Sequence, residues 1–293
     1  MRKLRFALFG NIYQAKKSLA VQKLLCQLEE HEADIYIDQP FYEYLVHTLQ
    51  LDVHPTGLIT DDHFDADIVV SMGGDGTFLK AASRVGNKRI PILGINMGRL
   101  GFLADISADE ISTAIEGIYA DAYTVEERSV LQVSYSNATP SVSPFALNEV
   151  AVLKRDNSSM ISIRINIDGE YLTTYQADGL IINTPTGSTG YALSVGGPIM
   201  SPSSHVLGLV PVAPHSLNVR PITLCDDVEI ELSVESRNHQ FLVAIDGRSE
   251  SCSENTKLHI RRASYNICVL KRPNSSFFRT LRNKLMWGSD VRE

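Results

Sequence analysis

The chain has 293 residues, which is long enough for about two domains of ordinary size. Hydrophobic residues make up 44% and charged residues 21%, which is typical of a globular protein rather than a disordered one. No apolar run reaches the roughly 18 residues of a membrane-spanning helix, and a formal net charge of −7 disfavours non-specific binding of nucleic acid. We therefore expect neither a membrane nor a nucleic-acid partner.

Strand-like and helix-like segments alternate over residues 1–120. Apolar strands separated by amphipathic segments predict a parallel sheet with helices on both faces. We therefore expect an α/β domain with a Rossmann-like sheet in this part of the chain. The predicted strands are Leu4–Gly10, Ile35–Ile37, Ile68–Met72 and Ile90–Asn96, and the predicted helices are Ala15–Glu30, Phe41–Leu51, Phe78–Val85 and Ala108–Tyr119.

Residues 121–270 consist mainly of short strand-like segments, which predict a mainly antiparallel, β-sandwich-like domain. Asp168-Gly169 and Asp246-Gly247 each follow a strand and indicate two tight hairpins. Residues 271–293 are predicted to form a tail that packs back on the first domain, with a helix at Ser276–Trp287. The predicted strands are Val130–Tyr135, Phe145–Lys154, Ser159–Ile167, Glu170–Tyr175, Leu180–Asn183, Val228–Val234, Phe241–Ile245 and Lys257–Arg262.

The cysteines and the first residues bear on the compartment. No two of the four cysteines form a CxxC pair, so we interpret them as reduced and buried. The first residues have a basic end, but their apolar stretch is too short for a signal peptide. Both observations favour the cytoplasm. The cysteines are Cys26, Cys225, Cys252 and Cys268.

The loop Gly73-Gly74-Asp75-Gly76-Thr77 lies between a predicted strand and a predicted helix. Such a loop presents bare backbone N–H groups and the positive end of a helix to a phosphate. Because a carboxylate repels phosphate, Asp75 suggests a general base or a group that helps to hold Mg²⁺. The alternative is a tight turn in which Asp75 only caps the helix. Neither a Walker A motif nor the third glycine of the dinucleotide-binding fingerprint is present.

Two further segments place polar residues in apolar surroundings. Residues 178–191 (DGLIINTPTGSTGY) join a strand to a loop rich in glycine and hydroxyl groups, which suits phosphates and ribose, with Tyr191 as a face for a base. The alternative is a Ser/Thr-rich turn that caps a helix. Asn148-Glu149 interrupts an apolar strand, so this pair either needs polar partners or lies at an edge that faces water.

These motifs resemble the NAD kinase family. GGDGT, residues 96–103 (NMGRLGFL), Asn148-Glu149 and residues 178–198 (DGLIINTPTGSTGYALSVGGP) occur there in the same order, and the resemblance spans about residues 65 to 275. GGDGT alone also occurs in diacylglycerol kinases, sphingosine kinases and phosphofructokinases, but the combination is specific. The resemblance implies an α/β domain followed by a β-sandwich-like domain. It also implies transfer of the γ-phosphate of ATP to the adenosine ribose 2′-hydroxyl of NAD, which makes NADP.

The resemblance assigns roles to particular residues. Asp75 would be the general base, Gly74 and Gly76 would lie against the phosphates, and Lys80 would contact the nucleotide. A divalent ion, Mg²⁺, would accompany ATP or polyphosphate, and no protein side chain is assigned to it. The family also implies a homo-oligomer, a dimer or a tetramer. The remaining residues implied to bind the dinucleotide are Asn148, Glu149, Asp178, Thr189, Gly190, Tyr191, Ala192, Leu193, Ser194, Ala213 and Arg248.

The chain departs from the family pattern at two positions. Gly190 stands where alanine is common, and Gln176 stands where many members have an arginine that could contact a phosphate. Two other functions remain open: a lipid kinase of the diacylglycerol type and a non-catalytic dinucleotide sensor. The first is disfavoured because no basic amphipathic membrane helix is evident, and the second because Asp75 is intact. Because the chain as a whole is acidic, nucleotides must be attracted by local groups such as the amides of the glycine loop, the helix N-terminus, Mg²⁺, Lys80 and Arg248. We expect catalysis in a cleft between the two domains.

Overall fold

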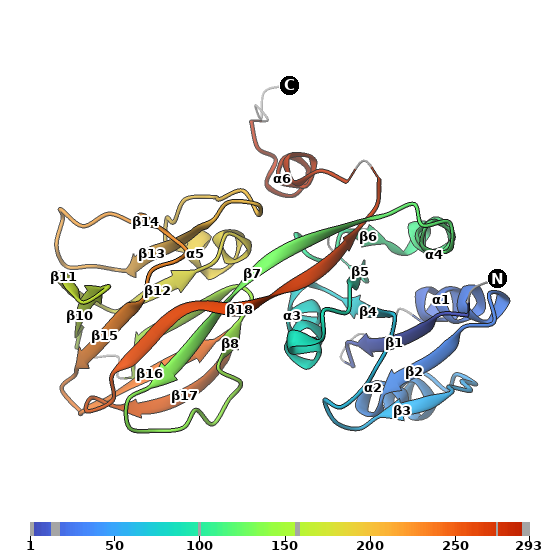
Figure 1. The fold of residues 1–293 in the computed structure, drawn as a ribbon, viewed down its shortest axis with the longest axis horizontal. Coiled ribbons are helices and arrows are strands. Elements are labelled where there is room, and N and C mark those ends of the chain that lie inside the picture. The colour runs from blue at the N-terminus through green and yellow to red at the C-terminus, as the bar shows by residue number, and fades with distance from the viewer. Residues whose placement is uncertain (1–2, 13–17, 99–100, 156–158, 274, 289–293) are drawn as a thin grey trace. The chain divides into compact units, whose positions relative to one another are not determined.

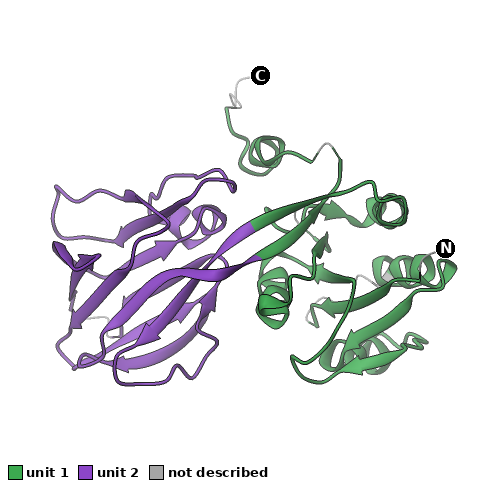
Figure 2. Cartoon of the chain, viewed as in Figure 1, with its two compact units in different colours: residues 1–127, 267–293 green, residues 128–266 purple. Residues whose placement is uncertain are grey.

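The computed structural model describes residues 3–12, 18–98, 101–155, 159–273 and 275–288 (Figure 1). The chain divides into two compact units, unit 1 with residues 1–127 and 267–293 and unit 2 with residues 128–266 (Figure 2). Two strands, β7 (Thr124–Tyr135) and β18 (Leu258–Lys271), continue from one unit into the other. No helix in the described ranges is long and apolar enough to cross a membrane.

Unit 1 is built on a parallel sheet. Its strand order is β18-β5-β4-β1-β2-β3, where β18 takes part with its last residues and β6 also pairs with β5, and each of these pairs is parallel. All residues of β4 and β5 are buried, as strands covered on both faces must be. The strands are β1 (Arg5–Gly10), β2 (Asp34–Asp38), β3 (Gly57–Ile59), β4 (Ile68–Gly73), β5 (Ile92–Asn96) and β6 (Ile106–Ser107).

Helices cover both faces of this sheet. Helix α3 (Asp75–Val85) packs against β1, β4 and β5, whereas α1 and α4 contact each other and share one hydrophobic core with the strands. The predicted α/β architecture with a Rossmann-like parallel sheet is thus confirmed. The other helical segments of unit 1 are α1 (Ser18–Glu30), α2 (Gln39–Glu43), η1 (Tyr44–Thr48), η2 (Gly86–Lys88), η3 (Ala108–Glu110), α4 (Ile111–Tyr119) and α6 (Phe277–Leu285).

Unit 2 consists of two antiparallel sheets. One has the order β14-β13-β12-β9-β16-β17, and the other contains β11, β10, β15 and the first part of β18, with β7 and β8. Fully buried residues of both sheets, such as Val150 and Val243 from one and Ile163 and Leu232 from the other, belong to a single core. The predicted sandwich-like, antiparallel second domain is therefore confirmed.

The strands of unit 2 include both predicted hairpins. Asp168 and Gly169 have φ of +49° and +83°, and Asp246 and Gly247 have φ of +46° and +79°, as tight turns of this kind require. The elements are β8 (Phe145–Ala146), β9 (Glu149–Lys154), β10 (Ile161–Ile167), β11 (Glu170–Ala177), β12 (Gly179–Asn183), η4 (Thr186–Thr189), α5 (Tyr191–Ser194), β13 (Val206–Val212), β14 (Ile222–Cys225), β15 (Ile230–Glu235), β16 (Gln240–Ile245) and β17 (Arg248–Ser253).

The strand predicted at Phe145–Lys154 is in fact two strands, β8 and β9. Between them, the N–H groups of Leu147 and Asn148 donate to the carboxylate of Asp246, as does the N–H of Glu149. The strand is interrupted here because the Asp246 carboxylate, rather than a neighbouring strand, accepts the hydrogen bonds of these N–H groups. Strand β9 lies between β12 and β16, so the interpretation of Asn148-Glu149 as a sheet edge is wrong.

Other predictions need correction. Strands β3, β6, β13, β14 and β17 were not predicted; β3 and β6 have only three and two residues, and β13 contains Pro211, which argues against a strand from sequence alone. The helix predicted at Phe41–Leu51 begins earlier, where Pro40 occupies the first turn. Cys26 and Cys225 are exposed rather than buried, although all four cysteines are free. Residues 15–17 of the first predicted helix lie outside the described residues.

The tight packing of β5 gives a stability prediction. A Cβ atom on Gly94 would lie 2.8 Å from the Leu103 oxygen and the Ala104 Cα, both backbone atoms, whereas one on Gly117 in α4 would be 3.4 Å from its nearest neighbour. Gly94→Ala should lower the free energy of unfolding by about 1–3 kcal/mol. Gly117→Ala should be neutral or add up to about 1 kcal/mol. Thermal melts that rank the two variants in the opposite order would contradict this packing.

Candidate functional site

The glycine-rich loop joins β4 to α3. Strand β4 ends at Gly73, Gly74 is the N-cap residue with φ of −102°, and α3 begins at Asp75. The predicted start at Phe78 is therefore one turn late. Helix geometry leaves the first N–H groups of α3 without intrahelical acceptors and places the positive end of the helix dipole at this loop. The loop is thus a feasible anion-binding element, and Lys80 lies exposed one turn further along α3.

The two glycines that flank Asp75 have no explanation in packing. A Cβ atom on Gly74 or Gly76 would meet no described atom within 4 Å, and neither residue has a positive φ. By contrast, a Cβ on Gly73 would overlap the side chain of Thr77. Gly73 is therefore required by the fold, whereas Gly74 and Gly76 leave bare backbone open to something that approaches the loop from outside.

The carboxylate of Asp75 is held by the backbone of the segment that joins β5 to β6. Its Oδ1 accepts the N–H groups of Leu103 at 3.0 Å and Ala104 at 3.1 Å, and its Oδ2 accepts that of Phe102 at 2.9 Å. The ammonium of Lys284, in α6, lies 3.4 Å from Oδ2. A carboxylate offers about four lone-pair positions, so in this structure each has a donor.

This arrangement rejects the interpretation of Asp75 as a helix cap, because α3 has no side-chain cap hydrogen bond. It also gives residues 101–104 a function that the motif alone did not reveal. A Cβ atom on Gly101 would overlap the Asp75 carboxylate, so this position has room only for glycine. Asn96 secures the same segment, since its side-chain amide donates to the Ala104 carbonyl at 3.3 Å.

In unit 2, the Asn148-Glu149 pair packs directly on the turn at residues 184–187. The Thr184 hydroxyl donates to the Leu147 carbonyl at 2.6 Å, and the Thr184 N–H donates to the Asn148 carbonyl at 2.9 Å. A Cβ on Gly187 would overlap the Asn148 backbone. The second and third sequence motifs therefore form one cluster, held from the other side by the Asp246 carboxylate.

Two acceptor atoms in this cluster are unused. Asn148 Oδ1 and Glu149 Oε2 are buried, and no described residue donates to either. Burial and, to a smaller extent, the negative charge of Asp246 raise the pKa of Glu149 to about 7, although a hydrogen bond from the Tyr191 N–H lowers it. An unpaired buried polar atom costs about 1–3 kcal/mol. Two of them on adjacent residues indicate a site built for a ligand that donates hydrogen bonds.

Gly190 makes room for this pair. A Cβ atom there would lie 2.9 Å from Glu149 Oε2 and 3.3 Å from Asn148 Nδ2. An alanine at this position would thus require the Glu149 carboxylate to move. Tyr191, the first residue of α5, is 39% exposed. The structure therefore brings Asn148, Glu149, Gly190 and Tyr191 together.

The other predicted dinucleotide residues of unit 2 have partners or positions of their own. Ala192 is fully buried in a small apolar cluster, Leu193 is partly buried and Ser194 is exposed. The Thr189 hydroxyl donates to the Thr186 carbonyl at 3.2 Å. The Asp178 carboxylate lies 2.7 Å from the Lys154 ammonium. Arg248 donates hydrogen bonds to the carbonyls of Ile245 and Phe145. Ala213 has a strained backbone, with φ of +44°.

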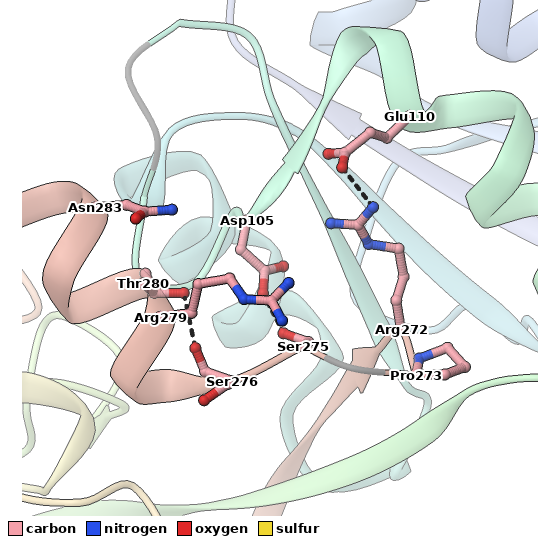
Figure 3. A pocket seen from close by; sticks show the side chains of 9 residues that line it. All are labelled: Asp105, Glu110, Arg272, Pro273, Ser275, Ser276, Arg279, Thr280 and Asn283. Carbon is pink, nitrogen blue, oxygen red and sulfur yellow. Dashed lines mark hydrogen bonds and ion pairs between the residues drawn. The ribbon is translucent and has the colours of Figure 1, made fainter.

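The segment that leads into α6 is anchored to unit 1 by ion pairs. The Lys271 ammonium lies 2.8 Å from Asp105, and the Arg272 guanidinium lies 2.6 Å from Glu110. Figure 3 shows Arg272 reaching Glu110. Both residues line a cavity of about 270 Å³, to which α6 contributes Arg279. These contacts fix the start of the helix that carries Lys284.

Sequence reasoning missed several residues of these clusters. Asp246 was predicted only as a turn residue, and Lys284 only as part of the C-terminal tail. The N–H groups of residues 102–104 carry no side-chain signal at all, although residues 96–103 were noted as a motif. Within the described part of the chain, no three His, Cys, Asp or Glu side chains come together to hold a metal ion.

Comparison with known proteins identifies the family. The model of the ATP-NAD kinase N-terminal domain matches residues 7–123, and that of the ATP-NAD kinase C-terminal domain matches residues 147–271. The chain belongs to the NAD kinase family. An NAD kinase of Bacteroides fragilis is 62% identical over 289 residues, covering 99% of this chain and 100% of the relative. One of Porphyromonas gingivalis is 41% identical, covering 98% and 99%.

Solved structures of NAD kinases share the fold. An NAD kinase from Archaeoglobus fulgidus, in complex with ATP, has a TM-score of 0.74 at 27% identity, over 97% of this chain and 99% of that chain. A yeast NADH kinase, complexed with NADH, has a TM-score of 0.87 at 23% identity, over 100% of this chain and 90% of that chain. The family is one of phosphotransferases, so the chain is an enzyme and an NAD kinase in its general activity.

The unused acceptor on Glu149 predicts a pH dependence. Because its folded-state pKa is about 7 and the usual value is near 4.3, the folded chain keeps a proton that the unfolded chain releases between these values. The free energy of unfolding is therefore greatest below that window and falls by about 4 kcal/mol, for this group, as the pH rises through it.

In Glu149→Gln this contribution is absent, so its unfolding free energy should fall less than that of the unsubstituted chain between pH 4.5 and 7.5. Denaturant unfolding monitored at several pH values measures the difference. The exposed Glu235→Gln is the matched control and should follow the unsubstituted chain. Parallel pH profiles for all three proteins would show that Glu149 does not titrate as its burial requires.

Proposed function

We propose that this chain transfers the γ-phosphate of ATP to the 2′-hydroxyl of the adenosine ribose of NAD, with Asp75 as the general base. The hydroxyl proton passes to the Asp75 carboxylate while the 2′-oxygen bonds to the γ-phosphorus. The bond from that phosphorus to the β–γ bridging oxygen breaks, and its electron pair leaves with ADP. The observation that carries the proposal is a carboxylate with fixed orientation beside bare glycine backbone at a helix N-terminus.

The phosphate loop would act by position and charge rather than by covalent chemistry. We assign Gly74 and Gly76 to the approach of a phosphate, since no packing explains them, and Lys80 to a contact with the nucleotide. Mg²⁺ enters the proposal as part of the ATP substrate, because it binds mainly through phosphate oxygens and water. The ATP complex of the Archaeoglobus fulgidus NAD kinase supports ATP as the donor.

In unit 2, the buried acceptors Asn148 Oδ1 and Glu149 Oε2 would receive hydrogen bonds from NAD. Its ribose hydroxyls and nicotinamide carboxamide are donors of the required kind. Tyr191 would offer its ring to the dinucleotide, with Thr189, Gly190, Leu193, Ser194, Asp178, Ala213 and Arg248 around it. Ala192 fits a packing role better, because it is fully buried among apolar residues. The NADH complex of the structurally similar yeast kinase is compatible with this assignment.

The setting of the enzyme is also a proposal. The family resemblance supports a cytoplasmic enzyme of NADP biosynthesis that assembles as a homodimer or tetramer. The same resemblance supports inorganic polyphosphate as a second phosphoryl donor. A lipid kinase and a non-catalytic sensor are not favoured, because both units match NAD kinase models and the close relatives are NAD kinases.

Replacement of Asp75 tests the proposed base. Asp75→Asn removes the base and also one of the two oxygens that accept hydrogen bonds from the N–H groups of residues 102–104. The chemical step and NAD binding must therefore be measured separately. We expect kcat for NADP formation from NAD and Mg-ATP, read with an NADP-dependent dehydrogenase, to fall by about 10²–10⁴-fold. The dissociation constant for NAD should change by less than tenfold. The exposed Asp227→Asn is the matched control, and a kcat near that of the control would rule out the base.

A further inference from the structure

The four donors on the Asp75 carboxylate are not equivalent. Three are backbone N–H groups of residues 102–104, which cannot leave unless the whole segment moves. The fourth is the Lys284 ammonium, at the end of a flexible stem and at the longest distance, 3.4 Å. A ribose hydroxyl that gives its proton to Asp75 needs one free lone pair on the carboxylate. Lys284 is the donor that can move away and free this lone pair.

The position of Lys284 does not depend on Asp75 alone. Its ammonium also lies 4.6 Å from the centre of the Phe102 ring, a cation–π contact. The same ring is 6.3 Å from that of Phe277 at the start of α6, and Leu281 anchors the helix as its buried residue. Lys284 therefore stays beside the phosphate loop even when its contact with Asp75 is broken.

Charge favours an exchange of partners. The Lys284 and Asp75 side chains are 31% and 29% exposed, and ion pairs in such settings contribute little to stability. Phosphate oxygens of a nucleotide bring more negative charge than one carboxylate. In the described residues, Lys284 is the one cation paired with Asp75, in a chain whose formal net charge is −7.

We propose that Lys284 is an exchangeable partner of Asp75 in the reaction. Without ligand it occupies the fourth lone-pair position of the carboxylate and keeps the oxygen that will act as base oriented. When NAD and Mg-ATP bind, the ribose 2′-hydroxyl takes this position on Oδ2, and the ammonium moves to oxygens of the transferred phosphoryl group. This inference rests on the proposed function, and it makes the C-terminal helix part of the reaction site in unit 1.

Steady-state kinetics of three single variants test the exchange. Lys284→Met removes the charge and keeps the length of the stem, Lys284→Arg keeps the charge, and Arg282→Met removes a charge from an exposed position of the same helix. We expect Lys284→Met to lower kcat by about 10- to 100-fold without raising the KM for NAD. Lys284→Arg should recover most of kcat, and Arg282→Met should equal the unsubstituted chain.

A double variant separates this role from a structural one. Because part of the effect of Lys284 passes through Asp75 and part through its contact with the phosphoryl group, Lys284→Met should lower kcat by a clearly smaller factor when Asp75 is already asparagine. The full loss in both backgrounds would overturn the proposal, as would a Lys284→Met enzyme that is as active as, or more active than, the unsubstituted chain. If the unsubstituted chain itself makes no NADP from NAD and Mg-ATP, the proposed function fails instead, and the two failures are thereby distinguished.

Discussion

The candidate site of unit 1 depends on one set of interactions. Three consecutive backbone N–H groups donate hydrogen bonds to the Asp75 carboxylate and fix its position. These hydrogen bonds join the loop after β4 to the segment after β5, at the carboxyl ends of neighbouring parallel strands, where α/β sheets place their ligands. Gly101 must be glycine because this carboxylate occupies the space of a side chain. The aspartate is thereby held facing the segment after β5 rather than its own helix.

Unit 2 uses the same device. The Asp246 carboxylate binds the N–H groups of residues 147–149, so that the strand breaks and the side chains of Asn148 and Glu149 are presented from a fixed backbone. In both units one aspartate orders a short segment by taking donors that a sheet would otherwise use. The unused acceptors on Asn148 and Glu149 are stable only because the surrounding backbone is held in this way.

The sequence was sufficient to predict the parts of the structure that depend on local patterns. Strand and helix alternation, the two Asp-Gly hairpins and the glycine loop all depend on neighbours in sequence, and the structure contains them. It was insufficient where a side chain reaches far along the chain. Asp246 lies 98 residues from Asn148, and Lys284 lies 209 residues from Asp75. The predicted turn accounts for Asp246 and the predicted C-terminal tail for Lys284, so no local signal remains to indicate the distant partner.

The most direct test of this account is hydrogen exchange at the amides of residues 102–104, resolved by NMR in the unsubstituted chain and in Asp75→Asn. If the carboxylate holds this segment, these three amides exchange slowly in the unsubstituted chain, and at least one becomes clearly faster in the variant, while amides of the hairpin at Asp168 in unit 2 are unchanged. Equal exchange rates at all three amides in the two proteins would contradict the account.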